Sequence, residues 1–191
     1  MRCILVLNGH PHNDADHYVH ALASAYAASA SERHEVRRVD LAKLDFPILR
    51  NPADWISGEL PEGLKEAMDA LIWADHVVIL YPLWMGEMPA LLKAMLEQLA
   101  RPGIAIERLE NGSYKKLLKG KSGRLIVTMG MPSRIYSVWF RAHSVKSLKR
   151  SILGFAGISP VKVSLVGNVE GSSAHRKKWL RKVERLGWRG S

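Results

Sequence analysis

The sequence predicts an α/β fold with a doubly wound, five-stranded parallel sheet that has helices on both faces. Apolar runs typical of buried strands alternate with stretches of helical periodicity, and this alternation occurs five times along 191 residues. Glycine or proline follows most of the apolar runs, as expected where a strand ends in a loop. Because strand-helix-strand connections in one sheet are right-handed, five such units produce a parallel sheet covered on both sides.

The first unit begins with a strand at residues 2–9, where the run "RCILVLNG" ends in an Asn-Gly pair. The alanine-rich segment 16–31 strongly favours a helix. Asp14 or Asp16 is the expected N-cap. Three apolar side chains of this helix are spaced to face the sheet: Val19, Leu22 and Tyr26.

The second unit opens with residues 34–41, which alternate apolar and polar side chains as an edge strand does. Three prolines and two glycines make residues 45–63 a long loop that is expected to cover something. The amphipathic segment 64–75 is the helix that leads into the third strand.

The third strand, residues 76–81, runs into the apolar turn "PLWMGEM" and then a helix at 89–100. The fourth strand is predicted at 123–130, and a single long helix at 136–157 ends in glycine. A last strand at 161–167 precedes a basic terminal helix, in which Trp179, Val183 and Leu186 lie on one face.

This order of elements predicts a flavodoxin-like sheet with strand order 2-1-3-4-5, built as a single domain over residues 1–191. Ligands of such sheets bind beyond the carboxyl ends of the strands, where the strand order reverses. The first, third and fourth strand-to-helix loops are therefore expected to carry the site.

The composition is that of an ordinary globular protein, with 47% apolar and 24% charged residues. Cys3 is the only cysteine, so no internal disulfide forms and a cytoplasmic location is expected. The net charge of +10 is compatible with binding to nucleic acid, anionic surfaces or anionic substrates. The simplest interpretation of the basic residues in the terminal helix is that they form its solvent-exposed face. We expect no specific nucleic-acid partner and no membrane insertion.

The first loop, residues 8–17, leads into a helix N-terminus and is a natural site for a phosphate. His10 and His12 can donate to phosphate oxygens, whereas Asp14 and Asp16 would repel them. The spacing His10-x-His12-x-Asp14 also matches the start of a metallo-hydrolase motif. Its further histidine is replaced by Ala15, so we expect no metal site.

In the third loop, Pro82 and Gly86 interrupt the strand, which places Leu83, Trp84 and Met85 at its end. A flat heteroaromatic ring would fit against these side chains, with their free backbone N–H groups bonding its polar edge. The fourth loop, residues 128–137, again leaves a strand through glycine and proline. Its expected ligand contacts and neighbouring titratable groups are Thr128, Gly130, Met131, Tyr136 and His143.

Taken together, "NGHP", "YPLWMGEMPALLKAMLEQ" and "TMGMPSRIYS" resemble the loops of the flavodoxin-like NAD(P)H:quinone oxidoreductase family. This family includes the mammalian quinone reductases and the ancillary subunit of a bacterial potassium efflux system. The resemblance covers nearly the whole chain.

The resemblance implies a flavin, usually FAD with FMN as the alternative, that passes a hydride from NAD(P)H through flavin N5 to a quinone or similar acceptor. It implies a cytoplasmic homodimer with Tyr136 and His143 as catalytic residues that stabilise charge on the reduced flavin. The expected cofactor contacts are His10, Asp16, His17, Pro82, Leu83, Trp84, Met85, Thr128, Gly130, Met131 and Tyr136.

Two other functions remain open from the sequence. The same fold would serve a regulatory subunit that senses flavin or nucleotide without significant turnover. A metal-dependent hydrolase would use His10, His12 and Asp14.

Overall fold

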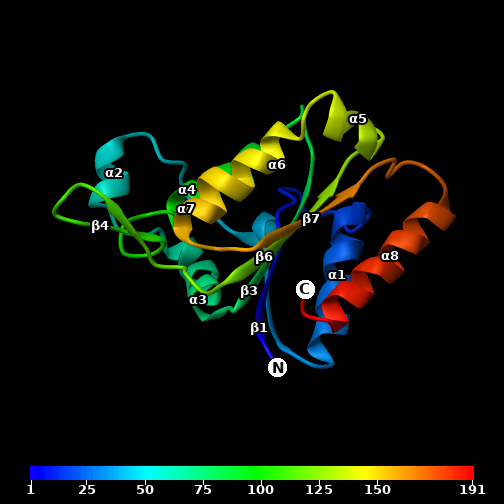
Figure 1. Ribbon diagram of the computed structural model, residues 1–191, viewed down its shortest axis with the longest axis horizontal. Coiled ribbons are helices and arrows are strands. Elements are labelled where there is room, and N and C mark those ends of the chain that lie inside the picture. The colour runs from blue at the N-terminus through cyan, green and yellow to red at the C-terminus, as the bar shows by residue number, and fades with distance from the viewer.

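The computed structural model describes residues 1–191, and its main sheet has five parallel strands in the order β2-β1-β3-β6-β7 (Figure 1). Counted along the chain, these strands have the order 2-1-3-4-5, so the predicted fold class is confirmed. Their bounds are β1 (Cys3–Asn8), β2 (Glu35–Asp40), β3 (His76–Pro82), β6 (Ser122–Thr128) and β7 (Val161–Val166).

Helices cover both faces of this sheet (Figure 1). On one face α1 (Tyr18–Ser31) lies beside α8 (Ser173–Trp188). The other face carries α3 (Lys65–Trp73), α4 (Ala90–Leu99) and a helical segment formed by α6 (His143–Ser147), η3 (Leu148–Leu153) and α7 (Gly154–Ala156).

The core between the sheet and α1/α8 is built as the helical spacing predicts. Val19, Leu22 and Tyr26 are all buried against the sheet, and Val183 of α8 joins them. Gly187 lets the two helices approach closely, because a Cβ atom there would lie 2.4 Å from the Tyr26 carbonyl oxygen. Most of the basic side chains of α8 are exposed, as expected for a solvated face, whereas Arg176 is half-buried and donates to the Val169 carbonyl at 3.2 Å.

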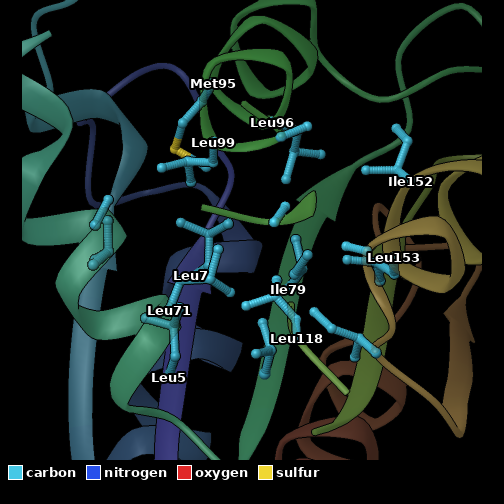
Figure 2. A pocket seen from close by; sticks show the side chains of 17 residues that line it. Leu5, Leu7, Leu71, Ile79, Met95, Leu96, Leu99, Leu118, Ile152 and Leu153 are labelled. Carbon is cyan, nitrogen blue, oxygen red and sulfur yellow. The ribbon is translucent and has the colours of Figure 1, made fainter. Parts of the chain in front are cut away.

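The larger core lies on the opposite face and contains a small apolar cavity of about 40 Å³. Figure 2 shows Leu7 and Ile79 of the sheet facing Met95, Leu96 and Leu99 of α4 across it. All of its lining side chains are hydrophobic. An apolar space of this size offers no partner to water or to a polar ligand, so it is a packing gap of the core.

The predicted N-cap of α1 is wrong, because the helix begins at Tyr18 and His17 occupies the cap position. Asp14 does not cap the helix, and its Oδ1 instead accepts a hydrogen bond from the backbone N–H of Asp16 at 3.1 Å. This hydrogen bond between the Asp14 side chain and the backbone two residues later competes with helix initiation, so α1 begins two residues after the predicted position.

The single helix predicted at 136–157 is also wrong at its beginning. A short α5 (Ser133–Val138) forms first, and the chain then breaks at Arg141 and Ala142, whose φ values of 52° and 47° are left-handed. Only from His143 onward is the segment continuously helical.

Several short elements are absent from the sequence prediction. The expected long loop contains α2 (Pro52–Ile56) and η2 (Glu62–Leu64), and η1 (Leu41–Lys43) precedes it. The irregular segment after α4 forms an antiparallel ribbon of β4 (Ile106–Arg108) and β5 (Tyr114–Lys116). None of the helices combines the length and the apolar composition that a membrane crossing needs.

Candidate functional site

A hollow of about 330 Å³ opens at the carboxyl ends of the strands, where the sheet order reverses between β1 and β3. This is the edge at which doubly wound sheets bind their ligands, and the volume suits one small heteroaromatic molecule. The lining residues come from four strand-to-helix connections: His10, His17, Tyr18, Val19, Pro82, Leu83, Trp84, Thr128, Met129, Gly130, Val169 and Glu170.

The third loop supplies the aromatic wall of the hollow. Trp84 and Glu87 exchange two backbone hydrogen bonds of 2.8 Å, and this tight turn holds the half-exposed Trp84 ring at the end of β3. The turn requires left-handed backbone at Met85 (φ 49°) and Gly86 (φ 84°). Met85 consequently points outward and is fully exposed.

The backbone donors of this loop differ from the prediction. The Leu83 N–H donates to the Thr128 carbonyl at 2.8 Å and the Trp84 N–H donates to Glu87, so neither is free. Among the three predicted donors, only Met85 has an N–H without a backbone partner.

The first loop is held by a chain of hydrogen bonds that begins on the edge strand. The Asn8 amide donates to Asp40 Oδ1 at 2.8 Å and to His20 Nδ1 at 2.6 Å. Because His20 Nδ1 accepts, its Nε2–H donates to the His12 carbonyl at 2.9 Å. Burial tends to raise the pKa of Asp40, but hydrogen bonds from Arg38 and Asn8 outweigh it and hold that pKa below its ordinary value.

The N-terminus of α1 opens directly into the hollow. The backbone N–H groups of Tyr18 and Val19 have no backbone partner, and no side chain caps the helix. Such free donors and the helix dipole together bind an anion. The His10 and His17 rings stack beside them with centroids 4.0 Å apart.

His10 is almost completely buried between this loop and Trp84, whose ring lies edge-on at 5.6 Å. Burial lowers the pKa of His10, and the neighbouring histidines lower it further. The imidazole is therefore neutral at physiological pH and acts in this site as a hydrogen-bonding group.

The fourth loop contributes Thr128 and Gly130, as predicted, together with Met129. Opposite them stands Glu170 from the loop after β7. Its Oε1 is 3.8 Å from the position that a Cβ atom on Gly130 would occupy, so the carboxylate and the fourth loop lie next to each other in the lining.

Tyr136 and His143 lie near each other, with ring centroids 6.4 Å apart, but neither lines the hollow. Tyr136 is completely buried, its hydroxyl has no hydrogen-bond partner, and burial raises its pKa. His143 is exposed, and its Nδ1 lies 3.0 Å from the Phe140 carbonyl oxygen. Its ring borders the third loop, 3.7 Å from the position of a Cβ atom on Gly86.

The structure thus brings together a majority of the predicted cofactor contacts, namely His10, His17, Pro82, Leu83, Trp84, Thr128 and Gly130. It leaves four outside the lining: Asp16 and Met85 are exposed, Met131 packs against the larger core, and Tyr136 is buried. The His10, His12 and Asp14 set of the alternative metal-dependent hydrolase is not what the fold assembles, because His12 and Asp14 approach His17 instead of His10.

Five lining residues were missed by sequence reasoning: Tyr18, Val19, Met129, Val169 and Glu170. Tyr18 and Val19 could have been identified from the sequence, because they stand at the start of the helix that follows the expected phosphate-binding loop. Val169 and Glu170 follow the fifth strand, whose carboxyl end lies at the same sheet edge as the others, so its loop was predictable as a fourth contributor.

A doubly wound sheet with an open, aromatic-walled hollow at its switch point defines a ligand-binding α/β protein of the flavodoxin type. The family model described as having a flavodoxin-like fold matches residues 2–187. The chain therefore belongs to this family, flavodoxin-2.

Named relatives span most of the chain. A Haemophilus influenzae protein, named an uncharacterized NAD(P)H oxidoreductase, is 28% identical over 86% of this chain and 83% of its own length. An FMN-dependent NADH:quinone oxidoreductase of Bacillus subtilis is 31% identical over 64% of this chain and 67% of its own. A Streptococcus mutans crystal structure aligns with a TM-score of 0.81 at 26% identity, covering 97% of this chain and 98% of the other.

Proposed function

We propose that this protein is a flavin-dependent NAD(P)H oxidoreductase whose acceptor is a quinone or a similar electrophile. The observation that carries the proposal is the hollow at the sheet's switch point, which combines an aromatic wall with an anion-binding helix end. The names of the Haemophilus and Bacillus relatives, an NAD(P)H oxidoreductase and a quinone oxidoreductase, support the same activity.

The residues present fit a flavin. Trp84, Leu83 and Pro82 offer a flat, mostly apolar wall at one side of the hollow. At its other side, the free N–H groups of Tyr18 and Val19 suit a phosphate. When bound, a flavin supplies hydride transfer between NAD(P)H and an acceptor, which no side chain of the site can perform alone.

We propose FMN as the flavin, in place of the FAD that the family resemblance implied. The Bacillus relative is named FMN-dependent, and no relative reported above is named for FAD. One helix N-terminus and two histidine rings are enough for the single phosphate of FMN.

The chain's own residues bind and orient the ligands. His10 is neutral, and in the tautomer whose Nδ1 accepts the His12 N–H at 3.1 Å its Nε2–H is left to donate to the phosphate. We assign His143 the role of stabilising charge at the third loop, since it is exposed beside Gly86. Tyr136 is too deeply buried to touch a ligand, so we propose that it positions His143.

We also propose a homodimer. An apolar surface flanks the third and fourth loops and consists of Met85, Ile135, Val138, Trp139 and Phe140, all exposed. Apolar patches of this kind mark protein interfaces. Sedimentation equilibrium of the wild type and of Trp139→Ser tests this: a dimer that dissociates in the variant supports the proposal, and a monomeric wild type refutes it.

Steady-state kinetics test the function itself. Without oxygen, the FMN-loaded protein should oxidise one equivalent of NADH or NADPH as its flavin is reduced, and it should turn over continuously only when a simple quinone such as menadione is present to reoxidise the flavin. His143→Ala should lower kcat with little change in FMN affinity. A protein that binds FMN but shows no turnover with either nucleotide would instead be the flavin-sensing subunit that the sequence left open.

A further inference from the structure

The loop between β1 and α1 gathers three metal-ligating side chains in one place. His12, Asp14 and His17 each place one ligand atom within 4.8 Å of those of the other two. His12 and Asp14 are exposed and His17 is half-buried, so solvent ions reach the group. Two imidazoles and a carboxylate form a ligand set typical of zinc and related divalent ions.

The spacing of the two imidazoles fits tetrahedral coordination. His12 Nδ1 lies 3.3 Å from His17 Nε2. Two nitrogens bound to one zinc ion at 2.0–2.1 Å with a tetrahedral angle are separated by about 3.3–3.4 Å. The Asp14 N–H points at His12 Nδ1 from 3.4 Å, which favours the tautomer whose Nδ1 carries a lone pair.

Neighbouring groups hold these ligands in place without a metal. The His17 ring is stacked on His10, and the His12 carbonyl accepts from His20 Nε2. Asp14 Oδ1 accepts from the Asp16 N–H, which orients the carboxylate and leaves its second oxygen free. Outer contacts that fix ligand orientation in this way are typical of metal sites.

A cation at this position also resolves an electrostatic conflict in the phosphate loop. Asp14 and Asp16 stand in the loop that leads to the proposed phosphate site, and carboxylates near a phosphate weaken its binding by charge repulsion. His17 belongs both to the metal-ligating group and to the lining of the hollow. A divalent ion bound there offsets the carboxylate charge next to the phosphate site.

We propose that His12, Asp14 and His17 bind one zinc-like divalent cation and that this cation strengthens binding of the flavin phosphate. The second half rests on the proposed function, whereas the cation site does not. The proposed cation site departs from the expectation of no metal site. It also differs from the ligand set of the alternative hydrolase, because His17 replaces His10 as the third ligand.

The cation site is tested on untagged, flavin-free protein titrated with zinc in a calorimeter and with cobalt, whose absorption reports coordination geometry. We expect one ion per chain and the intense visible bands of tetrahedral cobalt. His12→Ala and His17→Ala should each weaken zinc binding by more than about tenfold, since loss of outer contacts alone costs that much. Asp14→Asn should weaken it too.

His175→Ala is the matched control. This histidine is half-buried like His17, but its Nε2 is engaged by the Gly167 carbonyl at 2.9 Å, on a different loop. Its zinc affinity should equal that of the wild type. Absence of zinc binding, or equal affinity in the control, His12→Ala and His17→Ala, overturns the cation site and leaves a simple hydrogen bond between the two imidazoles.

The link to flavin is tested by titrating FMN with zinc present and with zinc chelated. Zinc should tighten FMN binding in the wild type and have no effect in His12→Ala. If zinc binds but does not change FMN affinity, the link is wrong and the cation site stands. If FMN binds without any zinc site, the proposed function stands alone, and if zinc binds while FMN does not, that function fails.

Discussion

Replacement of Trp84 by alanine separates a ligand-site wall from ordinary core packing. The ring is 46% exposed and lies at the end of β3, where it lines the hollow. Its loop is held by backbone hydrogen bonds to Glu87 that do not need the side chain. The substitution therefore removes the surface that faces the flavin and leaves the turn in place.

The expected loss of FMN affinity follows from the value of aromatic stacking. Alanine substitution of a stacking aromatic costs about 1–3 kcal/mol per heteroaromatic ring. This corresponds to an increase in the FMN dissociation constant of about 5- to 150-fold. The free energy of unfolding of the flavin-free protein should fall by only about 1 kcal/mol, because nearly half of the side chain is already in water.

Trp188 provides a control of equal exposure. It is 45% exposed at the end of α8, and Arg33 lies 4.2 Å over its ring. Trp188→Ala should lose at least as much stability as Trp84→Ala, since a cation–π contact of about 0.5–1 kcal/mol is lost as well. Fluorescence titration with FMN and urea unfolding are measured on both variants. Unchanged FMN affinity in Trp84→Ala, or an equal loss in Trp188→Ala, would refute the assignment.

Three further predictions concern the scaffold of the site. Burial lowers the pKa of His76 to about 4 from about 6.5 in the unfolded chain. The unfolding free energy should therefore keep its full value above pH 6.5 and fall by up to about 3 kcal/mol as the pH drops to 4, because the unfolded chain binds the proton first. Urea unfolding across this range should show the decline in the wild type and a flatter profile in His76→Gln. Asp40→Ala removes the acceptor that holds the Asn8 amide. Because such a hydrogen bond is worth about 1 kcal/mol, FMN affinity should fall about fivefold. An unchanged FMN titration would show that other contacts hold the first loop. Gly187→Ala forces α8 away from the Tyr26 carbonyl and should lower the unfolding free energy by about 1–3 kcal/mol, and a neutral effect would contradict the close packing of α1 and α8.

The three central strands β1, β3 and β6 were predictable because they are buried on both faces and contain continuous apolar runs, as at His76 to Tyr81, whereas the edge strand β2 was recognised only by its alternation. Helix limits were less accessible. The break at Arg141 and Ala142 depends on two left-handed residues that no glycine or proline announces. The start of α1 depends on whether Asp14 caps the helix or bonds the backbone of Asp16, and local propensity favours both.

The lining of the hollow coincides with the expected contacts where residues lie at or directly after the end of a strand, as Pro82, Leu83 and Trp84 do. It was not predicted where tertiary packing decides a direction. Met85 adopts a left-handed turn and points outward, and Tyr136 turns into the core beneath the fourth loop. Neither orientation can be read from spacing, because both depend on contacts between separate loops.

The absorbance spectrum of the purified protein, with extraction and identification of its cofactor, tests the central claim most directly. The account predicts flavin bands in the visible range, one FMN released per chain on denaturation, and the return of those bands when FMN is added to stripped protein. A colourless protein that gains no bound flavin after FMN or FAD is added would contradict it.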